Sequence, residues 1–109
     1  MGRTEHVALS ISVVIVAYES GATLARCLAS LRTGEPEAEV IVVDNAGGDR
    51  AVAERFDVRL IEPRENLGYA GGCNRGASEA TGDVVVFLNP DTVVDPGALH
   101  RLSESLQDS

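Results

Sequence analysis

The chain has 109 residues, enough for one domain with a single core but few for an enzyme that must hold two substrates. Nine basic and seventeen acidic residues give a formal charge of −8, which argues against nucleic acid and anionic lipid surfaces as partners. All nine basic residues are Arg, which excludes enzymes that depend on a Schiff-base lysine, a P-loop lysine or a receiver-domain lysine. We therefore expect a fragment of a larger protein.

The cysteines and the hydropathy of the chain bear on the cellular compartment in which the protein works. Cys27 and Cys73 lie in segments of helical period and form no Cys-x-x-Cys motif, and we recognise no secretory segment before the first strand. The longest apolar run, residues 11–17, is far shorter than the roughly 20 residues that a membrane span needs. We expect a reducing, cytoplasmic location, with residues 1–10 as a flexible leader.

Short runs rich in Val and Ile alternate with longer segments of helical period, which is typical of βαβ units. The predicted strands are Ile11–Ala17, Glu39–Asp44, Val58–Glu62 and Asp83–Leu88. The first, second and fourth are nearly continuously apolar, which predicts cover on both faces, and the weaker third is expected nearer an edge. The predicted fold class is α/β, with three α/β/α layers and a mainly parallel sheet in the order 3-2-1-4.

Four helices are predicted around these strands. The second covers Arg50–Phe56 and the third Gly71–Ala80, while residues 34–37 read as a solvated loop. The expected caps are Ser20 or Thr23 for the first helix and Asp95, followed by Pro96, for the fourth. The expected buried positions are Leu24, Cys27, Leu28 and Leu31 in the first helix, Cys73, Ala77 and Ala80 in the third, and Leu99, Leu102 and Leu106 in the fourth.

Two apolar strands end on acidic residues. The second stops at Asp44-Asn45 and the fourth at Asn89-Pro90-Asp91. Ligands of open α/β sheets bind at the carboxyl ends of the strands, so the two acids predict one shared site for a nucleotide phosphate and a metal. Asp91 suits Mg²⁺ or Mn²⁺ bridging to a diphosphate, and its alternative is a simple Pro-Asp turn.

Asp44 has three interpretations. A dinucleotide site would place it on a ribose hydroxyl, but the loop after the first strand lacks Gly-x-Gly-x-x-Gly, so we reject NAD. An Asx turn with Asn45 is the structural alternative. The functional interpretation is an acceptor for the imide N–H of uracil or thymine, with Tyr18 and Glu19 supplying other contacts to base or ribose.

A glycine-rich approach to the third helix, residues 65–76, would aim backbone N–H groups at an anion. Asn66, Gly68 and Asn74 are its candidate nucleotide contacts, although the glycines also suit tight turns and close packing. Arg75 could pair with phosphate, but an exposed salt bridge is the commoner fate of such a residue. We assign no role to His6 and His100, which lack metal-ligand spacing.

The ordered blocks Val-Val-Ile-Val-Ala-Tyr-Glu-Ser, Val-Ile-Val-Val-Asp-Asn-Ala, Glu-Asn-Leu-Gly-Tyr-Ala-Gly-Gly-Cys-Asn-Arg-Gly and Phe-Leu-Asn-Pro-Asp-Thr carry a resemblance. From about Ile11 to Leu106, the chain resembles the amino-terminal, nucleotide-sugar-binding half of a family 2 glycosyltransferase, a Rossmann-like half of the GT-A fold. Its Asn-Pro-Asp triplet is similar to that of the rhamnosyltransferase-like branch. This implies a dTDP-sugar donor, although UDP-sugars are common in the family.

The resemblance also implies residue roles. It places Ala17, Tyr18 and Glu19 around base and ribose, Asp44 on the pyrimidine, and Asp91 on Mg²⁺ or Mn²⁺. Asn89 stands where many relatives have the first acid of Asp-x-Asp, and an amide there implies contact with ribose or water.

The implied reaction is an inverting displacement at the anomeric carbon, onto a glycan or lipid-linked acceptor. The implied base and the acceptor-binding half lie beyond Ser109, so residues 11–109 form the donor subdomain and we expect no transfer by this chain alone. The full-length enzyme could work at the inner membrane surface. The alternatives are a standalone nucleotide-binding or regulatory module and a nucleotidyltransferase, which the loop after the first strand disfavours. We also expect Val93, Val94 and Leu99 to be uncovered and to favour a homodimer.

Overall fold

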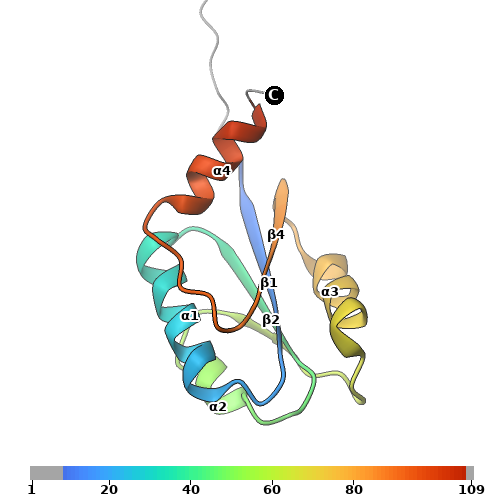
Figure 1. Ribbon diagram of the computed structural model, residues 1–109. Coiled ribbons are helices and arrows are strands. Elements are labelled where there is room, and N and C mark those ends of the chain that lie inside the picture. Colours follow the sequence, from blue (N-terminus) through green and yellow to red (C-terminus); the bar gives the residue numbers. More distant parts are fainter. Residues whose placement is uncertain (1–8, 108–109) are drawn as a thin grey trace, which may run out of the picture.

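The computed structural model describes residues 9–107, which form a four-stranded parallel sheet with helices on both faces (Figure 1). The strand order is β3-β2-β1-β4, as predicted. The strands are β1 (Ile11–Ala17), β2 (Glu39–Asp44), β3 (Arg59–Ile61) and β4 (Val84–Leu88), and the helices are α1 (Gly21–Gly34), α2 (Arg50–Ala53), α3 (Gly68–Glu79) and α4 (Ala98–Gln107). The helix α2 is shorter than expected, and α3 begins earlier.

One face of the sheet is covered by α1 together with α2 and the segment that leads to α4. The face of α1 predicted to be buried is buried, with Leu24, Cys27, Leu28 and Leu31 each at 0% exposure. These side chains pack against the alternate residues of β1 that point to this side, such as Val13 and Ile15. The larger part of the core therefore lies on this face.

Within residues 9–107, the opposite face is covered by α3 alone, which approaches the sheet through glycines (Figure 1). Gly72 and Gly76 are the buried residues of α3, and a Cβ at Gly76 would lie 2.4 Å from a methyl carbon of Val14. The predicted face of Cys73, Ala77 and Ala80 is only half-buried. The glycines, rather than the alanines, bring helix and sheet together.

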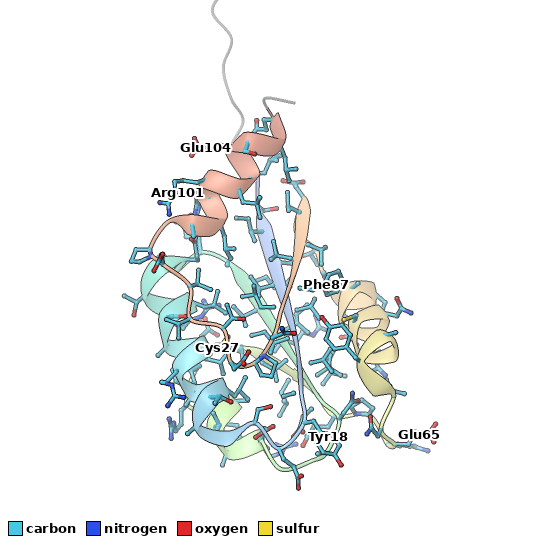
Figure 2. All side chains as sticks on the ribbon, viewed as in Figure 1. Tyr18, Cys27, Glu65, Phe87, Arg101 and Glu104 are labelled. Atoms are coloured by element: carbon cyan, nitrogen blue, oxygen red, sulfur yellow. The ribbon has the colours of Figure 1, made fainter. Side chains whose placement is uncertain are left out.

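The strand β4 is not covered on both faces, contrary to the prediction. It forms one edge of the sheet, and its residues Val85 and Phe87 are 36% and 45% exposed. Both point to the side of α3, because they pair in register with Ser12 and Val14 of β1, but α3 packs on β1 and β2 instead. Figure 2 shows Phe87 on this side of β4. The expectation that β3 lies at an edge is confirmed.

The segment between β4 and α4 turns back along α1 (Figure 1). The Val94 N–H donates to the Ser30 hydroxyl at 2.9 Å, and the Gly97 N–H donates to the Gly34 carbonyl at 3.3 Å. Val94 and Leu99 are therefore buried, which contradicts the expectation that both are uncovered and confirms the burial of Leu99 predicted from the helical pattern. Val93 is 63% exposed, as expected. The prediction for the rest of α4 was wrong, because Leu102 and Leu106 are 46% and 52% exposed.

Residues 34–37 are not simply a solvated loop, because Glu35 is fully buried. Its carboxylate accepts the Leu99 N–H at 3.0 Å near the start of α4 and bonds to Nδ1 of His100. The expected cap Asp95 instead precedes a turn at Pro96 and Gly97, where Gly97 has a φ of 77°. The carboxylate of Glu35, remote in sequence, thus anchors the start of α4. It is also the partner of His100, to which the sequence analysis assigned no role.

The flexible leader was expected to cover residues 1–10. Residues 1–8 of the expected leader, including His6, lie outside the described residues, whereas the Ser10 N–H already donates to the Asp83 carboxylate at 3.0 Å. Within residues 9–107, none of the helices has the length and apolar character needed to cross a membrane.

Candidate functional site

Asp44 ends β2 at the carboxyl edge of the sheet and organises the turn that follows. Its side chain is buried, at 1% exposure. One carboxylate oxygen accepts the Gly47 N–H at 2.9 Å and the other accepts the Asp49 N–H at 3.0 Å. This is the geometry of the Asx-type alternative, and it also fixes a carboxylate at the end of a central strand. Its contact with a pyrimidine remains a prediction.

The loop after β1 lies beside this turn. Ala17 pairs in register with Asp44, and its carbonyl accepts the Asn45 N–H at 2.9 Å. Tyr18 is 59% exposed, and Glu19 is exposed with a φ of 48°, which is a left-handed conformation. Tyr18 lies at the same end of the molecule as Glu65, opposite Arg101 and Glu104 of α4 (Figure 2). Two side chains predicted to contact base or ribose are therefore free at the edge that bears Asp44.

The glycine-rich loop reaches the same place through Asn45. The Asn45 amide donates to the Gly68 carbonyl at 3.0 Å and accepts the Leu67 N–H at 3.2 Å. Asn66 turns inward on its own loop, where its side-chain oxygen accepts the Gly68 N–H at 2.8 Å. The structure thus brings Asn66 and Gly68 towards the end of β2 that carries Asp44.

Other predicted residues of α3 are not drawn into this group. Asn74 is exposed on the second turn of α3, and among the described residues no contact joins it to Asp44. Arg75 pairs with Glu79 at 3.1 Å, which confirms the expected exposed salt bridge. Contact of Asn74 with a nucleotide stays a prediction.

Asn89 and Asp91 leave the sheet before the level of Asp44. Leu88, the last residue of β4, pairs with Ile15, whereas Asp44 pairs with Ala17, so β4 ends two residues, about 7 Å, short of the level of Asp44. The Asn89 carbonyl lies 4.0 Å from the Sγ of Cys27, and both Asn89 and Asp91 are exposed. No hydrogen bond or ion pair described within residues 9–107 joins Asp91 to Asp44.

Cys27 lies on α1 (Figure 2), and its Sγ approaches the carbonyl of Asn89, the first residue after β4. Burial, with the nearby Asp91 carboxylate as a smaller cause, raises the pKa of its thiol to about 11. Cys27 is therefore a protonated core residue at neutral pH, as the helical pattern predicted.

A divalent cation at this edge would have few protein ligands. Within residues 9–107, no three or more His, Cys, Asp or Glu side chains are grouped to hold a metal ion. Mg²⁺-type sites of nucleotide enzymes commonly use one or two carboxylates, with substrate phosphates completing the coordination. The exposed carboxylate of Asp91 fits that kind of site.

Two residues of the edge were missed by the sequence reasoning. Asp49 is buried, and its carboxylate accepts the Ser20 N–H and the Gly21 N–H, both at 2.9 Å. Ser20 is the N-cap residue of α1, as expected, but its side chain makes no capping hydrogen bond, so the Asp49 carboxylate caps the helix instead. Asn45 was considered only as part of a turn. The sequence signal for Asp49 was an acid before a predicted helix, which favours a cap of α2 rather than of a helix almost thirty residues earlier.

Comparisons with known proteins agree with the fold. Residues 12–109 match the profile of glycosyl transferase family 2. Succinoglycan biosynthesis protein ExoO of Rhizobium meliloti is 35% identical over 100 residues, which cover 86% of this chain and 29% of that protein. The chain spans 33% to 39% of the length of three other curated relatives.

Two solved structures show the same arrangement. Staphylococcus aureus TarS superposes with a TM-score of 0.79 at 22% identity, covering 91% of this chain and 20% of TarS. Glucosyl-3-phosphoglycerate synthase of Mycobacterium tuberculosis, in complex with Mn²⁺, UDP and phosphoglyceric acid, superposes with a TM-score of 0.73 at 25% identity. That match covers 90% of this chain and 39% of the synthase.

Proposed function

Because the chain belongs to glycosyl transferase family 2, we propose that it forms the donor-binding part of an enzyme that transfers a sugar from a nucleoside diphosphate sugar. In this proposal the transfer inverts the anomeric carbon, and the acceptor is a glycan or a lipid-linked sugar. The acceptor site and the catalytic base belong to the remainder of a longer enzyme, since the chain spans only about a third of several relatives.

The observation that carries the proposal is the convergence of two loops on the turn after β2. Asp44 offers a fixed carboxylate at a strand end, and the exposed Tyr18 and Glu19 stand beside it. A carboxylate accepts hydrogen bonds and cannot donate them, so it selects a base edge that presents an N–H. The imide N–H of uracil or thymine meets that requirement, which favours UDP or dTDP.

The charge of the edge supports a metal requirement. Glu19, Asp44, Asp49 and Asp91 are all acidic, and the whole chain has no Lys, so a diphosphate would meet repulsion here without a cation. Asp91 would hold Mg²⁺ or Mn²⁺ together with the diphosphate, and Asn89 would contact ribose or water. When bound, the cation would neutralise the charge of the departing nucleoside diphosphate.

Two arguments bear on which nucleoside diphosphate the donor sugar carries. The Asn-Pro-Asp triplet is similar to that of rhamnosyltransferase-like enzymes and favours dTDP, whereas the synthase from M. tuberculosis was solved with UDP and Mn²⁺. We propose a pyrimidine nucleoside diphosphate in either case, because Asp44 would contact the imide edge that uracil and thymine share.

Calorimetric titration with UDP and dTDP, each with and without Mn²⁺, tests the proposal. We expect metal-dependent binding that weakens in Asp44→Asn and loses its metal dependence in Asp91→Asn. Asp57→Asn, an exposed acid before β3, is the matched control and should bind as the wild type does. Absence of any pyrimidine nucleotide binding by the folded chain, or equal binding of NAD, would refute it.

A further inference from the structure

We propose that Asn45 and Asp49 are positioning residues, which use the turn after β2 to hold both loops that flank the nucleotide site. The inference rests on the proposed function. Residues 44–49, here called the β2–α2 turn, send one side chain to the loop after β1 and another to the glycine-rich loop. Neither Asn45 nor Asp49 needs to touch the nucleotide for this role.

Asp49 holds the loop after β1. Its two carboxylate oxygens each accept one backbone N–H, from Ser20 and from Gly21, and its side chain is 2% exposed. The loop needs such support because Glu19 and Gly21 have φ values of 48° and 39°, in a region that non-glycine residues enter at a cost. The carboxylate also lies at the amino end of α1, where negative charge is favourable. Asp49 therefore fixes the backbone that carries Tyr18 and Glu19.

Asn45 holds the glycine-rich loop. Its amide donates to the Gly68 carbonyl and accepts the N–H of the preceding residue, Leu67, which fixes both the position and the direction of the chain as it enters α3. The contact depends on a close approach, because a Cβ at Gly72 would lie 3.3 Å from Nδ2 of Asn45. Gly68 has a φ of 72°, so the loop turns sharply at the residue that Asn45 holds.

Asp44 joins the two contacts into one unit. Its carboxylate accepts the N–H of Asp49 at 3.0 Å and that of Gly47 at 2.9 Å, and Gly47 has a φ of 82°. The residue proposed to bind the pyrimidine thus also sets the turn from which Asp49 reaches the first loop. A displacement of this turn would move the base contact and both flanking loops together.

The experiment separates local order from nucleotide affinity in Asp49→Ala and Asn45→Ala. Hydrogen–deuterium exchange of the intact chain should rise over residues 18–24 in Asp49→Ala and over residues 66–70 in Asn45→Ala. In both variants, UDP with Mn²⁺ should bind roughly tenfold or more weakly, as when groups that orient the ligands of a site are removed. Asp49→Asn keeps one of two acceptors and should fall between wild type and Asp49→Ala.

Glu35→Gln is the matched control. Glu35 is also a buried carboxylate that accepts a backbone N–H near a helix start, but it lies on the loop before β2, at the opposite edge of the sheet. Its substitution should lower the thermal midpoint and leave both UDP affinity and exchange over residues 18–24 unchanged. If Glu35→Gln weakens UDP binding as much as Asp49→Ala does, general destabilisation explains the effect and the inference is overturned.

The remaining outcomes are distinct. Unchanged exchange in both loops overturns the inference whether or not the chain binds nucleotide, and increased exchange with unchanged UDP affinity also overturns the positioning role. If the wild type binds no pyrimidine nucleotide, the proposed function fails. In that case the positioning role fails with it, and increased exchange would leave Asn45 and Asp49 as structural contacts only.

Discussion

The two faces of the sheet pack against helices through opposite kinds of residue, large on one face and small on the other. On one face, α1 inserts three fully buried leucines and a cysteine against β1 and β2, and the core there is deep. On the other, α3 presents Gly72 and Gly76, and the backbone of the helix comes close to the valines of β1. The first face is stabilised by large side chains that fill the space between helix and sheet. The second depends on glycines, which let the backbone of the helix lie close to the sheet.

The two faces are therefore sensitive to opposite kinds of substitution. Removing atoms from the leucine face leaves a cavity, whereas adding atoms to the glycine face creates a clash. The glycine face also holds a buried hydroxyl, Ser12, which donates to Glu39 at 2.6 Å and accepts the Gly82 N–H at 2.8 Å.

Leu28→Ala should be the most damaging change on the leucine face. Leu28 is fully buried in α1, and loss of such a side chain costs about 2 to 5 kcal/mol of unfolding free energy. Urea unfolding measures the loss. The matched control is Leu102→Ala on α4, where the side chain is 46% exposed and a loss below about 1 kcal/mol is expected. Equal losses at the two positions would contradict the description of the core.

Gly76→Ala should damage the glycine face although alanine favours helices. The new Cβ would lie 2.4 Å from a methyl carbon of Val14, and overpacking of this kind costs about 1 to 3 kcal/mol, against a gain of up to about 1 kcal/mol in helix propensity. In a Val14→Ala background the clash disappears, so the same substitution should become neutral or stabilising. A double-mutant cycle in urea measures the coupling, and additive effects would rule out the close approach.

Glu39→Gln should remove a pH-dependent part of the stability. The hydrogen bond from Ser12, followed by that from the Thr81 N–H, lowers the pKa of the Glu39 carboxyl below its usual value of 4.5. The folded state therefore favours the ionised form, so its contribution is present above pH 4.5 and is lost as the pH falls through the lowered pKa. We expect a loss of about 1 kcal/mol at pH 7 that shrinks in acid, measured by urea unfolding between pH 3 and 7. A loss of equal size at all pH values would contradict this assignment.

Val85→Thr should have the smallest effect, although Val85 points to the same side of the sheet as α3. It is 36% exposed on β4, and substitution of a partly exposed valine by an isosteric residue is expected to change stability by about 0.5 kcal/mol or less. Val14→Thr places the same hydroxyl at a position with 1% exposure and should cost several times more. Similar thermal shifts for the two variants would show that β4 is covered on this side.

Much of the fold followed from periodicity. Continuous apolar runs identified the central strands, and the spacing of Leu24, Cys27, Leu28 and Leu31 identified the buried face of α1, because both patterns are local. The prediction for α4 failed for the same reason. Leu99, Leu102 and Leu106 have helical spacing, but the buried residues of α4 are Leu99 and Ser103, whereas Leu102 and Leu106 are exposed. The spacing of the leucines does not show which face of a helix the rest of the fold covers.

The residues of the candidate site that lie at strand ends could be predicted from the sequence. The residues that hold the neighbouring loops and helix ends in place could not. Asp44 was identified because an acid at the end of a buried strand lies where ligands bind in open α/β sheets, although the structure shows that its carboxylate also stabilises the turn that follows. Asp49 and Glu35 escaped notice because each caps a helix remote in sequence, and a capping carboxylate is recognised from sequence only when it immediately precedes its own helix. The two-residue offset between Leu88 and Asp44 was equally hidden, since strand register depends on pairing partners.

The central position of β1 has a consequence for biosynthesis. Translation completes β1 first of the four strands, yet Val13 pairs on one side with Val40 and on the other with Val86, on the last strand to be made. At the usual elongation rate of roughly 5 to 20 residues per second, a strand that is apolar except for Ser12 waits seconds for its second neighbour. A nascent chain of this kind would gain from a chaperone that shields residues 11–17 until β4 has emerged, and slow codons before β4 would prolong its exposure to aggregation.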